Sequence, residues 1–154
     1  MQCACFSGKS HQHAVKNVII AEATEHIAYL SDTYEGSVHD KAITDESGYT
    51  FPDNSTVYQD RGFEGYTCNG VNIQQPKKKP KSGTLTSDEK LENQRISRIR
   101  VKIEHIIRSV KRYRIVSEKI RIYCDEFRDS VMETCCGLHN FLNKRKRQLS
   151  QNKP

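Results

Sequence analysis

The 154-residue chain has few apolar residues and none of the long apolar runs that a membrane helix needs. Hydrophobic residues make up 35% of the chain, and no stretch approaches the ~18 consecutive apolar residues of a spanning helix. The segment MQCACFSGKSHQH turns polar within a few residues, which is not the pattern of a secretory signal. We therefore predict a cytoplasmic protein of one domain, with long polar segments lying outside a modest core.

Metal-binding cysteine patterns are also missing. Cys3 and Cys5 are separated by one residue and Cys135 and Cys136 by none, whereas zinc sites pair cysteines at wider spacings. The six histidines form no zinc pattern either. Nothing indicates an oxidising compartment, so we predict reduced structural thiols rather than a metal or redox site.

Acidic residues are too few to balance the basic ones. Twenty-five Lys and Arg face nineteen Asp and Glu, which gives a formal net charge of +6, and the basic residues cluster after residue 76. This asymmetry favours a polyanionic partner, with nucleic acid the first candidate. The loop QQPKKKPKSGTLTSDEK, with Lys77, Lys78 and Lys79, is either a solvated linker or a segment that contacts phosphate.

Short β-branched runs in the first half predict strands. Residues 15–20 (VKNVII) and 26–30 (HIAYL) suggest a hairpin or adjacent strands. Ser37 is the expected N-cap of a short helix. Residues 55–60 (STVYQD) predict a strand that ends in the carboxylate of Asp60, and the following RGFEGYTCNG holds three glycines that allow close backbone approach.

Two amphipathic helices are predicted in the second half. The first begins at the N-cap Ser87 and carries an apolar stripe made of Ile96, Ile99, Ile103, Ile106, Ile107 and Val110. The segment YRIVSEKIRIY is either a strand or a bent continuation of this helix. The second helix covers residues 127–142, and a frayed basic tail follows it.

Glu104 is the lone carboxylate in the basic stretch RIRVKIEHIIRSVKRYR. At 100° per residue it shares one side of its helix with Arg100, Arg108 and Lys111, at the border of the apolar stripe. One interpretation is an ion pair with the arginine four residues before or after it. The other is a divalent-metal ligand, because Mg²⁺ binds carboxylates together with waters and phosphate oxygens.

Asp60 is the natural second carboxylate for such a site. Strand-end side chains beside a helix carboxylate can converge on a metal, and two such ions can activate water against a phosphodiester. The competing interpretation of Asp60 is a turn-forming Asp before Gly62. Composition and spacing leave both open.

Six stretches together resemble the DDE superfamily endonuclease type of bacterial insertion-sequence transposase, a group related to Harbinger transposases. They lie in the family's order over residues 6–143 and read FSGKSHQHAVKNVII, YEGSVHDKAITDE, VYQDRGFEGY, QPKKKP, RISRIRVKIEHIIRSVKRYRIV and DSVMETCCGLHNFL. The resemblance implies an α/β fold of the ribonuclease H type, a mixed sheet flanked by helices, in which three acidic residues bind Mg²⁺ or Mn²⁺.

The resemblance also implies roles for individual residues. Asp60 matches the second acidic residue of the triad and Glu104 the third. Arg100, Glu104 and Lys111 fit the group's Arg-x3-Glu-x6-Lys signature, although Ser97 stands where the family often has Tyr. Phosphate contacts are expected from the basic residues of the helix and the loop, namely Arg100, Arg108, Lys111, Lys77, Lys78 and Lys79.

Accessory motif positions follow from two further stretches. GKSHQHAVK supplies Lys9, His13 and Lys16, with Ala14 where Thr is more usual. Asp40 in SVHD matches a family motif without being assigned to the metal. The implied partners are DNA, in the form of transposon ends and target, and a second copy of the chain.

The family's first catalytic Asp lies shortly before the SGK segment, after a helix-turn-helix region. This chain begins at MQCACFSGK, and neither feature is found in it. We therefore expect the C-terminal portion of a transposase, with a partial catalytic domain over residues 1–143, a basic tail over 144–154, and an upstream polypeptide as the source of the missing parts. Alone it should be nearly inactive and marginally folded, which leaves open whether it acts as an enzyme.

Two other functions compete with this interpretation. A non-catalytic module that binds nucleic acid through the basic loop and helix would show salt-dependent affinity and would not depend on Glu104. A small structural protein would have neither property.

Overall fold

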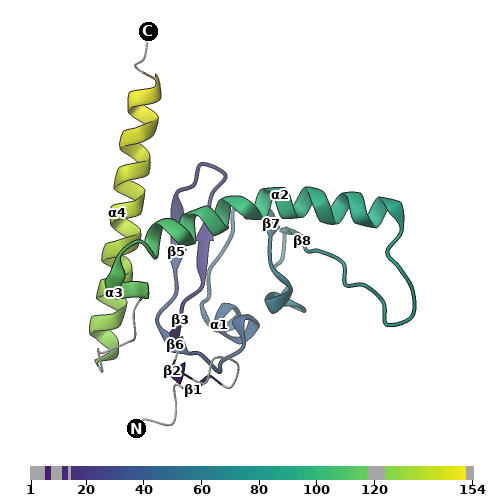
Figure 1. Cartoon of the computed structure of the whole chain (residues 1–154), viewed down its shortest axis with the longest axis horizontal. Coiled ribbons are helices and arrows are strands. Elements are labelled where there is room, and N and C mark those ends of the chain that lie inside the picture. Colours follow the sequence, from purple (N-terminus) through teal and green to yellow (C-terminus); the bar gives the residue numbers. More distant parts are fainter. Residues whose placement is uncertain (1–5, 8–11, 14, 118–123, 152–154) are drawn as a thin grey trace. The chain divides into compact units, whose positions relative to one another are not determined.

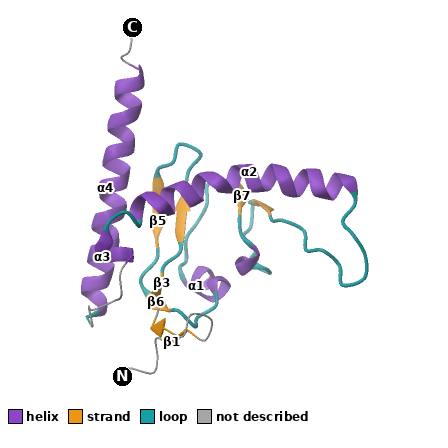
Figure 2. Ribbon diagram, in the orientation of Figure 1, coloured by secondary structure: helices purple, strands orange, loops and turns teal. Residues whose placement is uncertain are grey.

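The computed structural model describes residues 6–7, 12–13, 15–117 and 124–151. The chain falls into two compact units, one formed by residues 1–38 with 104–154 and the other by residues 39–103. A long helix, α2 (Ser87–Val110), contributes to both. Figure 1 shows the order of the elements along the chain, and Figure 2 shows how short the strands are beside the two long helices.

The described part of the first unit contains three antiparallel strand pairs. β1 (Phe6–Ser7) pairs with β2 (Gln12–His13), β3 (Val15–Lys16) with β6 (Tyr34–Glu35), and β4 (Ile19–Ala21) with β5 (Ile27–Leu30). The predicted hairpin is confirmed by β4 and β5, which are joined by a turn with Glu25 at positive φ. The apolar run over residues 15–20 is interrupted between β3 and β4, so its first part pairs with β6 and its last part with β5.

The helix α4 (Asp125–Gln151) completes the first unit and contacts β5 (Figure 1). The Asn140 amide acts as a strand partner for Ile27: its Oδ1 accepts the Ile27 N–H at 2.8 Å, and its Nδ2 donates to the Ile27 carbonyl at 3.0 Å. His139 Nε2 lies 3.0 Å from the Glu25 carbonyl, and Asn143 Nδ2 donates to the Thr24 carbonyl. These bonds satisfy backbone groups of Ile27 in β5 and of the turn that precedes it.

The core of the first unit is small. Its buried apolar side chains come from the hairpin, the end of α2 and α4, and are Val18, Ile27, Ile106, Val110, Cys135 and Cys136. Burial, with the neighbouring Cys135 as a lesser cause, raises the pKa of the Cys136 thiol to about 11, so this side chain is a packing group at neutral pH. The prediction of reduced thiols holds for the four described cysteines, and Cys3 and Cys5 lie outside the described residues.

The second unit holds α1 (Asp40–Glu46), β7 (Thr56–Tyr58), the 3₁₀ turn η1 (Arg61–Phe63), β8 (Asn72–Gln74) and the first part of α2. β7 and β8 are parallel, with Val57 opposite Ile73. Ile43 and Ile96 are fully buried in this unit. The stripe predicted for α2 is confirmed, because all six of its residues are buried or half-buried.

Two predicted helix caps are wrong. α1 begins after His39 instead of Ser37, and no side chain caps it. At α2, Ser87 is already helical, and Thr86 is the capping residue: its Oγ1 accepts the Glu89 N–H at 3.2 Å while Glu89 Oε2 accepts the Thr86 N–H at 3.0 Å. This reciprocal arrangement is a full capping box, and its N-cap lies one residue before the predicted one.

The C-terminal elements also differ from prediction. The segment after α2 was predicted as a strand or as a bent continuation of α2. Its described part instead forms the separate short helix α3 (Arg114–Ser117). Residues 118–123 lie outside the described part. α4 does not stop at Leu142 but continues through most of the predicted tail. The division of the chain at residue 143 stays a prediction.

At the level of fold class the α/β expectation is confirmed, since each unit combines helices and strands among the described residues. Within the described residues the strands pair only two by two, three pairs being antiparallel and one parallel. Among those residues no helix has the length and apolarity to cross a membrane.

Candidate functional site

Asp60 lies just beyond the carboxyl end of β7, in the turn that begins η1. Its Oδ1 accepts the Arg61 N–H at 2.6 Å, which caps the turn. Its Oδ2 forms an ion pair with Arg100 Nη2 of α2 at 3.1 Å. The Asp60 side chain is 56% exposed, whereas that of Arg100 is 23% exposed. The carboxylate is therefore oriented by both a backbone N–H and a guanidinium while it still reaches solvent.

The parallel pairing of β7 and β8 brings a second segment to the same edge. Because parallel strands end on the same side, Gln75 follows β8 beside the Asp60 turn, and its Nε2 donates to the Asp60 carbonyl at 3.0 Å. The Gln59 N–H also donates to the Gln74 carbonyl at 3.0 Å. The carboxyl edge of parallel strands is the usual location of ligand sites in α/β proteins.

Asp40 supports the turn from α1. A Cβ built on Gly62 would collide with Asp40 Oδ2, so the carboxylate of Asp40 lies directly against the backbone of the turn. A side chain at position 62 would require the Asp40 carboxylate to shift. The accessory position Asp40 thus contacts the turn two residues after Asp60.

Glu104 is exposed and forms no ion pair within the part of the chain that the structure describes. One interpretation was an ion pair with Arg100 or Arg108. Neither pair is seen among the described residues, and the Arg100 guanidinium binds Asp60. Glu104 follows Arg100 by one turn of the same helix, at the point where α2 passes from one unit into the other. The convergence of Glu104 with Asp60 stays a prediction, as do the roles of the exposed Arg108 and Lys111.

The basic loop is fixed to α2 at its base. The Lys77 N–H donates to Asn93 Oδ1 at 2.8 Å, and Asn93 Nδ2 donates back to the Lys77 carbonyl at 3.0 Å. The Lys77 ammonium lies 3.2 Å from Glu89 Oε1, within the capping box of α2. The ammonium group of Lys77 is therefore partly neutralised, whereas Lys78 and Lys79 are exposed beyond it.

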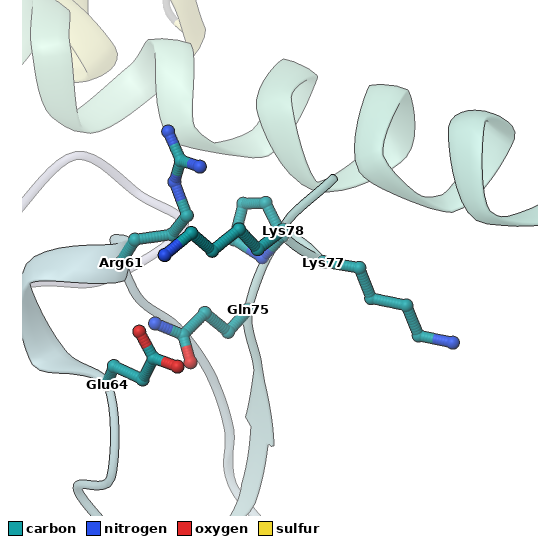
Figure 3. Close-up of a pocket in the computed structure, with 6 residues that line it drawn as sticks. Arg61, Glu64, Gln75, Lys77 and Lys78 are labelled. Atoms are coloured by element: carbon teal, nitrogen blue, oxygen red, sulfur yellow. The ribbon is translucent and has the colours of Figure 1, made fainter. Parts of the chain in front are cut away.

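A small open pocket lies between this loop and the Asp60 turn. It has a volume of about 200 Å³ and is lined by Arg61, Glu64, Gln75, Pro76, Lys77 and Lys78. Figure 3 shows the Lys77 side chain pointing away from the other labelled side chains, in accord with its pairing to Glu89. Arg61 and Lys78 are then the cations of the pocket, and Glu64 adds a carboxylate to its lining. Arg61 and Gln75 were not predicted from the sequence, although Arg61 directly follows Asp60 and Gln75 stands at the start of the basic loop.

The accessory segment near the N-terminus is described only in part. Lys16 Nζ donates to the Val38 carbonyl at 2.7 Å, a structural bond inside the first unit. His13 belongs to β2, and Lys9 lies outside the described residues.

A metal ion is only partly accommodated by these residues. Carboxylate oxygens suit Mg²⁺ and Mn²⁺, and Asp60 is exposed enough to offer one. However, both of its oxygens already have partners, and within the described ranges no three His, Cys, Asp or Glu side chains lie together as metal ligands would. The described residues do not form a complete metal site, so we derive no reaction step through an ion.

Comparison with known proteins agrees with this arrangement of motifs. The family model described as DDE superfamily endonuclease matches residues 1–140. The chain belongs to this family. A relative from Microchaete diplosiphon, named as the probable transposase for insertion sequence element IS702, is 32% identical over 117 residues.

That match covers 75% of this chain and 42% of the relative, so the chain spans less than half the length of the transposase that it resembles. No solved structure matches the chain. DDE superfamily endonucleases generally depend on divalent metal. The family expected from the sequence is confirmed. The ribonuclease H arrangement and the roles of the site residues stay predictions.

Proposed function

We propose that this chain takes part in the metal-dependent cleavage and transfer of DNA strands by which an insertion sequence moves. The observation that carries the proposal is the ion pair between Asp60 and Arg100. It joins the QDRGF turn to the Arg-x3-Glu-x6-Lys helix, two motifs far apart in the sequence, at the carboxyl edge of a parallel strand pair. The Asp60 carboxylate also has a structural role, because it caps η1, so the proposal depends on the two family motifs meeting at this strand edge.

In this proposal Asp60 and Glu104 are metal ligands, and the metal is Mg²⁺ or Mn²⁺. Arg100 balances the Asp60 carboxylate and is placed to contact a phosphate when a cation takes over that charge. The remaining phosphate contacts come from the exposed cations of the second half of the chain, Arg108, Lys111, Lys77, Lys78 and Lys79. Lys77 contributes least, because Glu89 shares its charge.

The third carboxylate of the triad is proposed to lie outside the described residues, on another segment or polypeptide. The proposal is supported by the match of two acidic residues to a family pattern that has three. We further propose that the complete catalytic domain has the ribonuclease H arrangement, in which the β7–β8 pair belongs to a larger mixed sheet. Without the third carboxylate the chain should show little or no nicking alone.

The alternative is a nucleic-acid-binding module without catalysis. The cations of the pocket beside Asp60 favour it, because Arg61 and Lys78 offer charge to a phosphate with no need of a metal. The two functions differ in what they require of Glu104, and this difference can be measured without any cleavage activity.

The decisive variants are Asp60→Asn and Glu104→Gln in the full chain. If Asp60 and Glu104 are metal ligands, each substitution should lower the affinity for Mn²⁺ about tenfold or more, since carboxylate oxygens are the ligands that the ion prefers. DNA affinity without metal should stay the same or rise, because a negative charge is removed. Calorimetry with Mn²⁺ and fluorescence anisotropy with a labelled duplex give the two affinities. Glu46→Gln, an exposed carboxylate at the end of α1, is the matched control.

An unchanged Mn²⁺ affinity in both variants would leave only the binding module. Robust Mg²⁺- or Mn²⁺-dependent nicking by the chain alone, abolished by both substitutions, would refute the need for a third carboxylate from elsewhere. Weak or absent nicking together with the predicted loss of metal affinity supports the proposal as stated.

A further inference from the structure

An asparagine on each of the two long helices bonds to both backbone groups of a single residue. On α4, Asn140 does this with Ile27. On α2, Asn93 does it with Lys77, accepting the N–H at 2.8 Å and donating to the carbonyl at 3.0 Å. Two bonds from one planar amide fix both the position and the rotation of the backbone that they hold. On α4 this device docks a hairpin to the helix, whereas on α2 it holds the start of the basic loop.

The far end of the basic loop is tied to the same helix. The Thr86 carbonyl accepts the Lys90 N–H at 3.0 Å, and Glu89 Oε2 accepts the Thr86 N–H at 3.0 Å. The other oxygen, Glu89 Oε1, lies 3.2 Å from the Lys77 ammonium, so one carboxylate joins the two ends of the loop. Glu89 and Asn93 are four residues apart and share one face of α2. We call these two residues the loop clamp.

Residues 78–85 (KKPKSGTL) lie between the two ends that the loop clamp holds. Lys78, Lys79 and Lys81 are exposed, and none of them forms an ion pair within the part of the chain that the structure describes. The ring of Pro80 restricts the backbone between them. A segment closed at both ends loses less conformational entropy when its cations bind an anion, because part of that entropy is already lost in the free protein.

The loop clamp also fixes how the loop passes the Asp60 turn. Two residues before Lys77, Gln75 Nε2 donates to the Asp60 carbonyl at 3.0 Å, so the chain between them is held at the turn and at α2. Figure 3 shows the side chains of Lys77 and Lys78 leaving the chain in opposite directions. With the Lys77 backbone fixed and its ammonium paired to the clamp, Lys78 is the lysine that remains for the pocket beside Asp60.

We propose that Asn93 is a positioning residue, which closes residues 78–85 into a preformed loop that binds the phosphodiester backbone. The lysines of the loop contact phosphate, and Asn93 acts through them without touching the ligand. This inference rests on the proposed function, because it takes DNA as the ligand. It adds that the affinity depends on a neutral amide, which offers no charge of its own. If the Asn93 bonds served stability alone, their loss would leave the contribution of Lys78 to DNA affinity unchanged.

The test is a double-mutant cycle of Asn93→Ala and Lys78→Gln in the full chain, with affinity for a labelled duplex measured by fluorescence anisotropy in metal-free buffer. In wild type, Lys78→Gln should weaken binding about threefold or more, since a phosphate contact is lost. Asn93→Ala should weaken it by about as much, although no charge changes. In the Asn93→Ala background, Lys78→Gln should cost about 1.5-fold or less, because Lys78 is no longer held in place.

Gln94→Ala is the matched control. Gln94 is an exposed amide beside Asn93 on α2, and its loss should change neither the affinity nor the cost of Lys78→Gln. Circular dichroism checks that the helix persists in every variant.

Limited proteolysis tests the loop clamp without DNA. Trypsin must bind a lysine side chain and the backbone around the cleaved bond, and at Lys77 the clamp holds both. The bond after Lys81, in the middle of the loop, serves as the internal reference. Asn93→Ala should raise the rate of cleavage after Lys77, relative to that after Lys81, about fivefold or more, because cleavage follows local opening. Gln94→Ala should leave this ratio unchanged.

The outcomes separate this inference from the proposed function. A smaller cost of Lys78→Gln in the Asn93→Ala background, together with faster cleavage after Lys77, supports it. An equal cost in both backgrounds would overturn it and leave DNA binding in place, with Asn93 only joining the loop to the helix. No effect of Lys78→Gln in wild type would overturn it as well. A wild type without measurable affinity for DNA would contradict the proposed function and, with it, the phosphate-binding role of the loop.

Discussion

At the residue scale, the two interpretations of Asp60 turn out to be compatible. One oxygen does what a turn-forming Asp does and caps η1, while the other faces the helix that carries Glu104. The sequence indicated both roles because each depends on local neighbours: a glycine two residues on, and a strand just before. Arg61 and Gln75 were not predicted, since their place in the site depends on the parallel register of β7 with β8. Register between distant strands leaves no local signal in so short a segment.

The contact of Asp40 with Gly62 gives a prediction about the turn itself. Gly62→Ala places a methyl group against Asp40 Oδ2, and either the carboxylate or the turn must move. The expected loss is about 1–3 kcal/mol of unfolding free energy, as for an overpacked site. In an Asp40→Ala background the same change should cost clearly less, with a coupling of about 0.5 kcal/mol or more. Urea denaturation of the four proteins of this cycle measures it.

Gly137→Ala is the control for the chemistry of the substitution. Gly137 lies on α4, and nothing comes within 4 Å of the position that a Cβ would take, so the methyl group should stabilise the helix by about 0.5–1 kcal/mol. Equal cost of Gly62→Ala with and without Asp40 would show that Asp40 does not hold the turn.

At the scale of elements, the helices were predictable and the strand pairing was not. The stripe of α2 follows from a period of three to four residues over a long segment, a signal strong enough to survive errors at the ends. Strands of two to four residues carry no comparable period, so the β4–β5 hairpin was the one pairing expected, and β7 was expected as a strand without an assigned partner. Helix ends fall between these cases, because Thr86 and Ser87 are both good caps and a bond three residues on decides between them.

The capping box of α2 can be checked by substituting the adjacent residues Thr86 and Ser87. Thr86→Ala should lower the unfolding free energy by about 1 kcal/mol, because the Glu89 N–H loses its acceptor. Ser87→Ala, the cap that the sequence suggested, should cost little, since Ser87 is already helical. Comparable losses in thermal or urea unfolding would mean that the helix begins one residue later than described.

The same box has a pH signature. Chiefly the Thr86 N–H, and next Lys77, hold the pKa of Glu89 below its ordinary value of 4.5. A carboxyl whose pKa is lower in the folded state stabilises the fold above its unfolded pKa, and this contribution disappears as the pH falls through the folded value. The stability difference between wild type and Glu89→Gln should therefore be full near pH 7 and shrink below about pH 4.5.

At the scale of the whole molecule, the charge of +6 predicts a salt-dependent affinity for nucleic acid, and the structure predicts which cations carry it. The logarithm of the association constant for duplex DNA should fall linearly with the logarithm of salt concentration, by about 0.9 for each phosphate contact. Lys77 and Lys78 are neighbours in the chain, but Glu89 pairs only with Lys77. Lys78→Gln should therefore reduce the slope by nearly one contact and Lys77→Gln by clearly less.

Arg61→Gln, which also changes a cation of the pocket lining, should act like Lys78→Gln, and the double variant should lose about two contacts. Anisotropy titrations from low to physiological salt provide the slopes. Equal effects of the two lysines would mean that the pair with Glu89 opens when DNA binds, so that the whole loop, rather than the pocket beside Asp60, is the contact surface. An unchanged slope in the double variant would instead move the DNA path to other cations, such as those of α2. The pocket lined by Arg61 and Lys78 would then not be the phosphate-binding site that places a scissile strand near Asp60.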